Sequence, residues 1–507
     1  MKALKYIFLS ALFIAGYGCS AYDDINTNPN AATTVSSSLL ATPLLLDLTA
    51  TGGTASGFIS DNCLAKQMVW LESLHDYNYN VLGRAGLGGY KTLMNVVKMV
   101  ELAPEEDKAA YQGLALFIKT YKLFYTSMQL GDIPYSEALQ GEEGNVKPKY
   151  DPQEDVMIAI MNDLDESARF FSEAHDFEGD PILQGNISKW QKTVDAFRLK
   201  VLLYLSMKED HPVLKIKERF ARIVTEGKLM KSNEDNFQLV FSNKAGQTYP
   251  FNTSVSKHYM YSTISSVMVD TLKAYNDYRL FYFAEPAKAL ISQGLQANDM
   301  NAYAGLDPAG DFSDLQSMNA DGKCCTMNLR YTEVVSGEPY IRLGYAEQCF
   351  ILAEGVLRGW ISGDANTYYN NGIKAAMKFV ADNTPDDNKY HHGMKITEAY
   401  ITDYLNSDRI ILSGSFDHKL KQIIGQKYLA YYMQHPFDAY YEYRRTGYPE
   451  LPINPETNRN TVKDKIPVRW MYSTWEYDFN RESVEEAVAR QYGGLDDNNK
   501  LMWILQK

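Results

Sequence analysis

The segment SKWQKTVDAFRLKVLLY, residues 188–204, decides the fold class. Ser188 and Gln191 have the spacing of a capping box, which marks the start of a helix. Behind this start, apolar residues recur at steps of three and four, so they share one face of a helix. These residues are Trp190, Val194, Phe197, Val201 and Tyr204. The segment therefore predicts a long amphipathic helix with one buried face.

The same signals recur along the rest of the chain. Asp151 and Pro152, followed by Glu154, are typical of a helix start, and Gly359 is typical of a helix end. Strand signals are short and lie at 237–241 and 331–335. We therefore predict a mainly α-helical protein with little β-structure. The other predicted helices cover residues 114–128, 152–171, 345–358, 364–379 and 420–433.

Long segments without helical periodicity separate these helices. Loops of this length inside a compact domain are usually either functional or disordered. Several are rich in aromatic residues, which favours loops packed on the helices. They cover residues 131–150, 241–262, 296–344, 383–396 and 446–482.

The N-terminus has the layout of an export signal. Lys2 and Lys5 precede an apolar run over 6–15, which is too short to span a bilayer. Small residues then lead to Cys19, although Gly16 stands where a bacterial lipobox prefers Leu. We predict a signal peptide over 1–18, lipidation at Cys19 and a polar tether over 19–38. The remaining residues, 39–507, are predicted to form a single helical domain.

Charge and composition exclude several classes of partner. The net charge of −13 argues against nucleic acid, since phosphate contacts need a basic surface. No stretch after residue 18 is apolar enough to cross a membrane. Contact with the membrane is therefore expected through the lipid anchor only.

Motifs of catalysis and cofactor binding are missing from the sequence. It contains no Gly-x-Ser-x-Gly, phosphate-binding loop, dinucleotide fingerprint or His-Glu-x-x-His. We therefore expect a protein that is not an enzyme, with no cofactor and no metal site. Calcium in the Asp- and Asn-rich stretches 298–314 and 496–499 stays open, as does the pairing of the later cysteines. These cysteines are Cys63, Cys324, Cys325 and Cys349.

Aromatic and amide side chains gather in two loop segments that are candidates for ligand binding. The chain has 37 Tyr, 21 Phe and 6 Trp, and aromatic rings pack against the C–H faces of sugars. Peptides bind to the same residue types, so this content does not separate the two ligands. The first cluster is Trp70, His75, Tyr77, Asn78 and Tyr79, and the second is Tyr249, Asn252, His258, Tyr259 and Tyr261.

A series of motifs in order along the chain resembles the SusD/RagB family of outer-membrane lipoproteins, in particular its SusD-like branch. The resemblance departs from the family pattern at Tyr278, Val468 and Ser473. The most specific motif is Glu442-Tyr443-Arg444-Arg445-Thr446-Gly447-Tyr448-Pro449. The other matching blocks cover residues 24–30, 131–138, 185–190, 275–280, 345–354, 466–480 and 493–503.

The resemblance implies a scaffold of tetratricopeptide-like helix pairs with a loop-built face that binds ligand. Such proteins sit outside the outer membrane and act as a lid on a SusC-like TonB-dependent transporter, to which they pass a glycan or, in some members, a peptide. A surface glycan hydrolase or an adhesin-like lipoprotein is the alternative from another class. We expect a structural role for the motif residues Glu347, Glu354, Arg444, Arg445 and Arg469, since guanidinium groups can brace carboxylates and loop carbonyls.

Overall fold

The computed structural model describes residues 35–51, 55–141, 144–254 and 257–507. The predicted signal peptide, Cys19 and the tether up to residue 34 lie outside these ranges. The first described helix, α3 (Ser37–Thr49), begins before the predicted end of the tether at residue 38.

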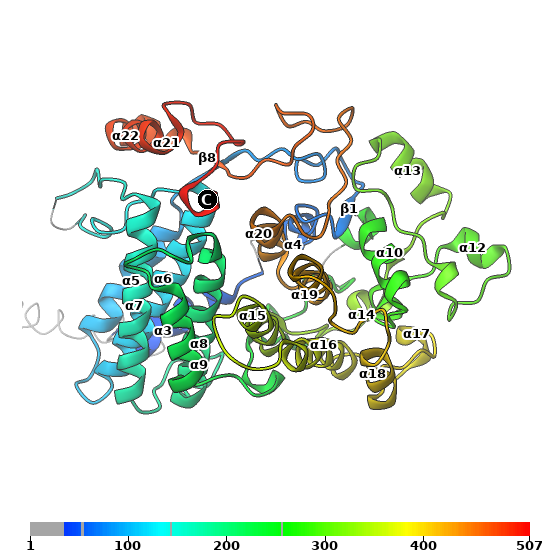
Figure 1. Ribbon diagram of the computed structural model, residues 1–507, viewed down its shortest axis with the longest axis horizontal. Helices are drawn as coiled ribbons and strands as arrows, with labels where there is room; N and C mark the ends of the chain where they lie inside the picture. Colours follow the sequence, from blue (N-terminus) through cyan, green and yellow to red (C-terminus); the bar gives the residue numbers. More distant parts are fainter. Residues whose placement is uncertain (1–34, 52–54, 142–143, 255–256) are drawn as a thin grey trace, which may run out of the picture.

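One group of helices forms the left part of the molecule in Figure 1. Consecutive members pack against each other: α5 on α6, α6 on α7, and α7 on α8. The helix predicted from residues 188–204 is α8. The group comprises α3, α5 (Gly89–Glu101), α6 (Lys108–Leu130), α7 (Gln153–Glu173), α8 (Ile187–Tyr204) and α9 (Ile216–Glu226).

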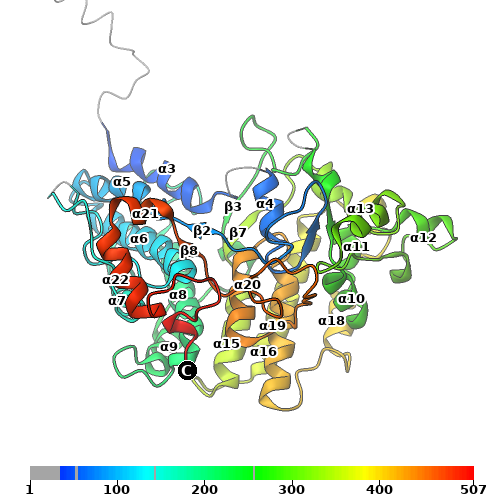
Figure 2. The ribbon, with the colours of Figure 1, turned by 90° about the horizontal axis from the view of Figure 1, so that it is seen from above.

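A second group of helices lies beside the first and is seen clearly in Figure 2. Helix α15 packs against both α16 and α19, and it also contacts α8, so it joins the two groups. The predicted pair at 345–358 and 364–379 is this α15–α16 pair. The group comprises α15 (Tyr345–Leu357), α16 (Ala365–Asp382), α19 (Phe416–Ala430) and α20 (Pro436–Thr446).

Shorter helices cover the remaining side, at the right of Figure 1, and the C-terminal end of the chain. Helix α13 lies inside the predicted loop 296–344, so this segment is only partly irregular. Helix α4 (Ala55–Asp61) leads into the predicted binding segment. The others are α10 (Ser266–Tyr275), α11 (Leu280–Phe283), α12 (Lys288–Ser292), α13 (Phe312–Ala320), α14 (Leu329–Thr332), α17 (Asn388–His391), α18 (Glu398–Leu405), α21 (Thr474–Phe479) and α22 (Arg481–Tyr492).

The strands form small two-stranded sheets, and the predicted mainly α-helical class with little β-structure is confirmed. The strand predicted near 237–241 is β3 (Phe237–Leu239), which pairs with β7 (Tyr340–Leu343). The strand predicted at 331–335 is wrong. This segment begins inside helix α14, whose N-terminus is capped by Asn328: the Asn328 side chain accepts a hydrogen bond from the Arg330 backbone N–H. The other strands are β1 (Met68–Trp70), β2 (Arg84–Ala85), β4 (Ser262–Ile264), β5 (Ala284–Glu285), β6 (Thr326–Met327) and β8 (Met471–Tyr472).

Helix ends follow the sequence signals, but not always through the expected residue. Helix α8 is capped by Asn186, whose side chain accepts the Lys189 N–H at 3.0 Å, and not by Ser188. Gln191 instead donates to the Phe171 carbonyl on α7. Gly359 does follow α15, with a φ of +72° that suits glycine.

The core is continuous and rich in aromatic rings. Trp190 on α8 stacks on Phe171 of α7 with ring centroids 5.5 Å apart, and Phe117 on α6 meets it edge-on at 5.3 Å. The periodic aromatic residues of the sequence are thus buried between helices. The cysteines at 63, 324, 325 and 349 are buried as free thiols.

Candidate functional site

The two predicted ligand-binding clusters lie side by side. Strand β1 pairs antiparallel with β4, which places Trp70 opposite Ser262. The Leu71 N–H also donates to the Tyr261 carbonyl at 2.7 Å. The pairing therefore joins segments that are far apart in the sequence.

Aromatic rings from both clusters surround Trp70. Its ring centroid is 6.1 Å from that of His75, 5.9 Å from His258 and 6.5 Å from Tyr261. His75, His258 and Tyr261 are half-buried, as is Tyr259 on the same turn, so part of each ring reaches the surface. Only 3% of Trp70 is exposed. Trp70 therefore forms the buried base of this aromatic group, and the half-buried rings form its accessible part.

Two other members of the first cluster hold the loop in place. The Asn78 side chain donates to the Trp70 carbonyl at 3.1 Å, and the Tyr79 hydroxyl donates to the Gly310 carbonyl at 3.1 Å. Both side chains are buried. They leave no surface for a ligand in this conformation, so we remove them from the candidate contacts.

Tyr249 and Asn252 are also removed from the candidate contacts. Tyr249 is 1% exposed and its ring lies among core rings, including Tyr331 at 6.4 Å. The Asn252 side chain donates to the Thr332 carbonyl. Aromatic and amide content in a loop does not distinguish side chains that face solvent from those that turn inward.

An open pocket of about 490 Å³ lies next to the aromatic group; we call it the outer pocket. His75 and Tyr77 line it together with Arg84 and Trp470. The Tyr77 ring is edge-on to Trp470 at 6.4 Å and to Phe437 at 6.5 Å. This volume lies within the range of about 300–1,000 Å³ that is usual for small-ligand sites.

A second pocket of about 270 Å³ lies next to the outer pocket, and we call it the inner pocket. Asp61 at the end of α4 lines both pockets, so they meet at this residue. Aromatic rings from α6, β7 and α20 form much of the inner wall. They are Tyr125, Tyr340, Phe437 and Tyr441, and polar lining is added by Gln129, Arg342, His435 and Asp438.

Burial raises the pKa of Asp61 from its ordinary 3.8 to about 7. Its carboxyl makes no hydrogen bond or ion pair with any other residue that the structure describes. A large share of Asp61 is therefore protonated at neutral pH, and the group can donate as well as accept a hydrogen bond.

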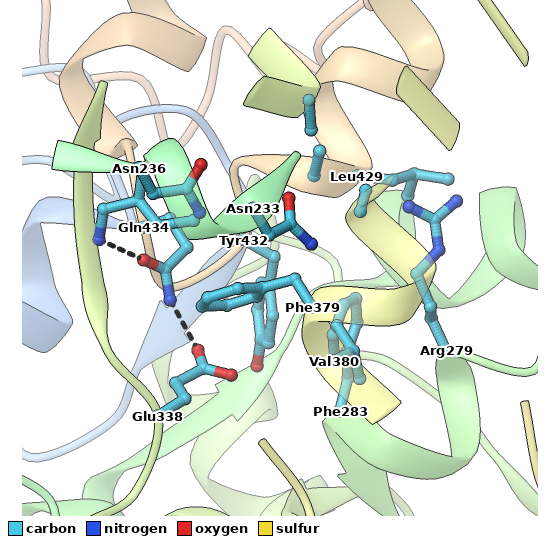
Figure 3. A pocket seen from close by; sticks show the side chains of 14 residues that line it. Asn233, Asn236, Arg279, Phe283, Glu338, Phe379, Val380, Leu429, Tyr432 and Gln434 are labelled. Atoms are coloured by element: carbon cyan, nitrogen blue, oxygen red, sulfur yellow. Dashed lines mark hydrogen bonds between the residues drawn. The ribbon is translucent and has the colours of Figure 1, made fainter. Parts of the chain in front are cut away.

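A third, smaller cavity is lined by residues of α16 and α19 (Figure 3). Its volume is about 30 Å³, which suits a water molecule but is too small for a sugar residue. On its wall, Gln434 donates to Glu338 at 2.7 Å. This cavity belongs to the packing of the core.

A family profile described as starch-binding and associating with the outer membrane matches residues 29–473. The chain belongs to the SusD-like family. The comparison with curated proteins gave no match.

Solved structures agree with this membership. A SusD homologue from Bacteroides fragilis shares 55% identity, covering 93% of this chain and 100% of the other, with a TM-score of 0.91. A candidate outer-membrane nutrient-binding protein from Bacteroides vulgatus shares 32% identity at 93% and 100% coverage, with a TM-score of 0.83. A chitin-binding protein shares 22% identity over 93% of this chain and 99% of its own, with a TM-score of 0.74, and shows the fold alone.

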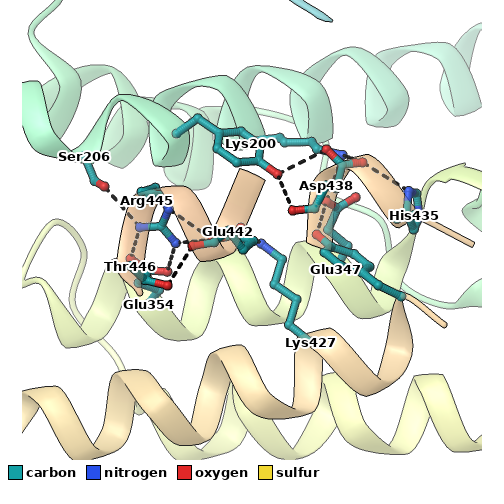
Figure 4. A network of polar contacts seen from close by, with 12 residues as sticks. Lys200, Ser206, Glu347, Glu354, Lys427, His435, Asp438, Glu442, Arg445 and Thr446 are labelled. Carbon is teal, nitrogen blue, oxygen red and sulfur yellow. Dashed lines mark hydrogen bonds and ion pairs between the residues drawn. The ribbon is translucent and has the colours of Figure 1, made fainter. Parts of the chain in front are cut away.

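SusD-like motif residues of the C-terminal half, among them Glu354, Glu442 and Arg445, meet in a buried polar network (Figure 4). Arg445 on α20 makes paired contacts with Glu354 on α15, at 2.6 and 2.7 Å. Arg445 also contacts Glu442 at 2.6 Å, and Glu442 accepts from Lys427 at 2.5 Å. Although burial alone raises it, the Arg445 charge and hydrogen bonds lower the pKa of Glu354 to about 2.

The other end of this network is centred on Lys200 of α8. Its ammonium group lies 2.9 Å from Asp438 and 2.9 Å from Glu347. Glu347 also accepts from the Tyr431 hydroxyl at 2.6 Å. Helices α8, α15, α19 and α20 are thus tied together by charges that are all paired.

The two remaining arginines with a predicted structural role, Arg444 and Arg469, hold the C-terminal loop segments in place. Arg444 donates to the carbonyls of Met128 and Val468 at 2.8 and 2.6 Å. Arg469 pairs with Asp496 at 2.7 Å, and its guanidinium carbon lies 3.9 Å from the centroid of the Tyr492 ring. These contacts join the C-terminal loop to α6 and α22.

Several lining residues of this SusD-like protein were not selected from the sequence. Trp470 lies in the predicted loop 446–482, and Asp61 and Arg342 lie outside any periodic pattern. Tyr125 belongs to the apolar face of α6, which the sequence places in the core. Within the described ranges, no helix is long and apolar enough to cross a membrane, and no group of three or more His, Cys, Asp or Glu could hold a metal ion.

Proposed function

We propose that this SusD-like protein captures a glycan at the cell surface and passes it to a SusC-like TonB-dependent transporter. The observation that carries the proposal is the outer pocket, which is open, has a volume of about 490 Å³ and is bordered by His75, Tyr77 and Trp470. Rings of this kind offer flat apolar faces to the C–H groups of a sugar. Asp76 and Arg84 on the same wall supply hydrogen-bonding groups.

The family and its fold support a glycan more than another ligand. The family is described as starch-binding, and a chitin-binding protein has the same fold. A peptide in an extended conformation is usually held by main-chain hydrogen bonds to a sheet edge. In the described chain, by contrast, the pockets are lined mainly by side chains from helices and loops.

The membrane part of the proposal rests on the N-terminal sequence and on the family. Lipidation of Cys19 would anchor the protein to the outer membrane, facing outside, with no transmembrane segment needed. The family is described as associating with the outer membrane. A lid that is tethered but not embedded can move over the transporter while it holds its ligand.

A surface glycan hydrolase is the rival function, because two carboxyl groups, Asp61 and Asp438, line the inner pocket. A retaining hydrolase needs one carboxyl group as a proton donor and the other as a free nucleophile. Asp61, with its pKa raised by burial, suits the proton donor, which leaves Asp438 as the nucleophile. Asp438 already accepts from Lys200, Tyr125 and Tyr204 and contacts His435. Since its oxygens are occupied, we favour binding without catalysis.

Calorimetry of the purified mature protein against glycans and peptides tests the proposal. We expect binding to at least one glycan and a loss of about tenfold or more in the His75→Ala and Tyr77→Ala variants, because truncating a central contact removes most of its interaction. His175→Ala is the control, since this side chain is 65% exposed and lines neither pocket. Binding to peptides alone would replace the glycan by a peptide. Turnover of the glycan, lost in Asp61→Asn, would favour the hydrolase.

A further inference from the structure

Arg342 differs from the fully buried arginines of the described chain. Each of those contacts at least one carboxylate, as is usual because an unpaired buried charge is costly. Arg444, which is half-buried like Arg342, also contacts no carboxylate, but it donates to the carbonyls of Met128 and Val468. For Arg342, no carboxylate lies within ion-pair distance in the part of the chain that the structure describes. The paired arginines are Arg198, Arg279, Arg330, Arg445 and Arg469.

The contacts of Arg342 leave most of its guanidinium group without an acceptor. Its one hydrogen bond is a long contact of 3.3 Å from Nη1 to the Tyr340 hydroxyl. The buried Nε has no acceptor among the described residues. The guanidinium carbon lies 5.4 and 5.7 Å from the ring centroids of Tyr340 and Tyr121. These rings hold the charge in place without neutralising it.

The acidic groups that line the inner pocket with Arg342 do not neutralise it either. Asp438 pairs with Lys200, and its oxygens also accept from tyrosine hydroxyls. Asp61 has a pKa raised to about 7 by burial, so much of it carries no charge at neutral pH. Burial also lowers the pKa of His435. Arg342 is therefore the side chain in this pocket whose charge lacks a direct counterpart.

We propose that the inner pocket binds the carboxylate of an acidic sugar residue, with Arg342 as its partner. The inference rests on the proposed function and narrows the ligand to a glycan that carries uronic or sialic acid units. A guanidinium group presents parallel N–H donors that match the two oxygens of a carboxylate. The protonated Asp61 carboxyl adds a donor where the inner and outer pockets meet.

The rest of the inner pocket fits a sugar ring. Tyr125, Phe437 and Tyr441 supply aromatic surface, and the Gln129 side chain lies on the same wall. A volume of about 270 Å³ has room for one sugar unit, while the outer pocket has room for the units that follow it. The acidic unit would thus be the end of the glycan that enters furthest.

Thermal melting of the purified mature protein with matched sugars tests this inference. The acidic probes are glucuronate, galacturonate and N-acetylneuraminate, and the neutral probes are glucose, galactose and N-acetylmannosamine, each up to 100 mM. A ligand that binds the folded state raises Tm, because it stabilises that state by RT ln(1 + c/Kd), where c is the ligand concentration. We expect a rise with at least one acid, none of similar size with its neutral counterpart, and a smaller rise at high salt.

Variants of Arg342 separate a specific contact from a general charge effect. In Arg342→Gln we expect the affinity for the acid to fall about 10- to 100-fold, as for a lost charge-assisted hydrogen bond. Arg342→Lys should keep part of it, because the charge remains without the planar fork. Arg481→Gln is the control, since Arg481 is exposed on α22 and outside both pockets.

The outcomes also separate this inference from the proposed function. If glycans bind but acids and neutral sugars shift Tm equally, or if no acid shifts it, the acidic-sugar assignment is overturned and the glycan-binding function stands. An acid effect that persists in Arg342→Gln overturns the role of Arg342. A comparable rise with the peptide Gly-Gly-Tyr, lost in Arg342→Gln, would assign the pocket to a peptide carboxylate and overturn both proposals.

Discussion

Two neighbouring regions of the molecule differ in whether their charged side chains have ion-pair partners. In the network between α8, α15, α19 and α20, every charged group has a direct partner, as with Arg445 between Glu354 and Glu442. In the inner pocket, Arg342 and Asp61 have none among the described residues. His435 and Asp438 belong to both regions, so the two patterns meet on α20.

This difference separates charged groups that stabilise the fold through ion pairs from charged groups that remain available to bind a ligand. Removing one partner of a buried ion pair strongly lowers the free energy of unfolding, because the other charge is left buried and unpaired. A buried charge that has no partner already lowers the stability of the protein when no ligand is bound. Proteins commonly keep such unfavourable groups at functional sites. The comparison therefore predicts opposite responses to mutation and to pH in the two regions.

The largest effect is expected from Arg445→Gln. Removing this guanidinium leaves Glu354 and Glu442 buried without their main partner, so the free energy of unfolding should fall by about 3–5 kcal/mol. Urea denaturation measures it. Arg481→Gln, which breaks an exposed pair with Glu485, should cost at most about 1 kcal/mol. Equal losses in the two variants would show that the network does not stabilise the fold.

Acid should weaken the network next. The pKa of Glu354 is held at about 2, below its ordinary 4.5. The stability it contributes is fully present above pH 4.5 and is lost as the pH falls towards 2. Linkage converts this shift to about 3 kcal/mol. Urea curves at pH 6 and pH 3 should show the loss in the natural protein and a smaller one in Glu354→Gln. The same loss in both would assign the acid effect to other groups.

Asp61 should respond in the opposite direction. Its pKa is raised from 3.8 to about 7, so the folded state holds a proton that the unfolded state releases. The stability linked to this group is therefore highest below pH 3.8 and falls as the pH rises through 7. Asp61→Asn should raise Tm at pH 8 and have little effect at pH 4. A variant that is less stable than the natural protein at pH 8 would reveal a partner for this carboxylate.

The smallest effect is expected from Arg342→Gln on stability. Because this charge has no carboxylate partner, its removal should leave the free energy of unfolding within about 0.5 kcal/mol or raise it. The measurement is urea denaturation without ligand. A loss close to that of Arg445→Gln would place Arg342 among the charges that hold the fold.

Sequence patterns predicted the helices well and the site only in part. Trp190 and Phe197 lie on the buried face of α8, as their spacing requires. The two aromatic segments chosen from the sequence come together at Trp70 and Tyr261, but the side chains of Tyr249 and Asn252 turn into the core. Trp470 and Asp61 were missed because they lie outside periodic segments, and no local pattern shows which pocket they reach.

The sequence by itself determined the helical class, the order of the helices and the resemblance to the SusD-like family, because periodicity, caps and motifs are local in the chain. The tertiary structure decided which charges are paired. Lys200 and Asp438 lie on α8 and α20, far apart in sequence, and meet only when these helices pack. Arg342 is left without a carboxylate by the same packing. Ion pairing depends on distances of a few ångströms across the fold, and these are set by the packing of the whole chain.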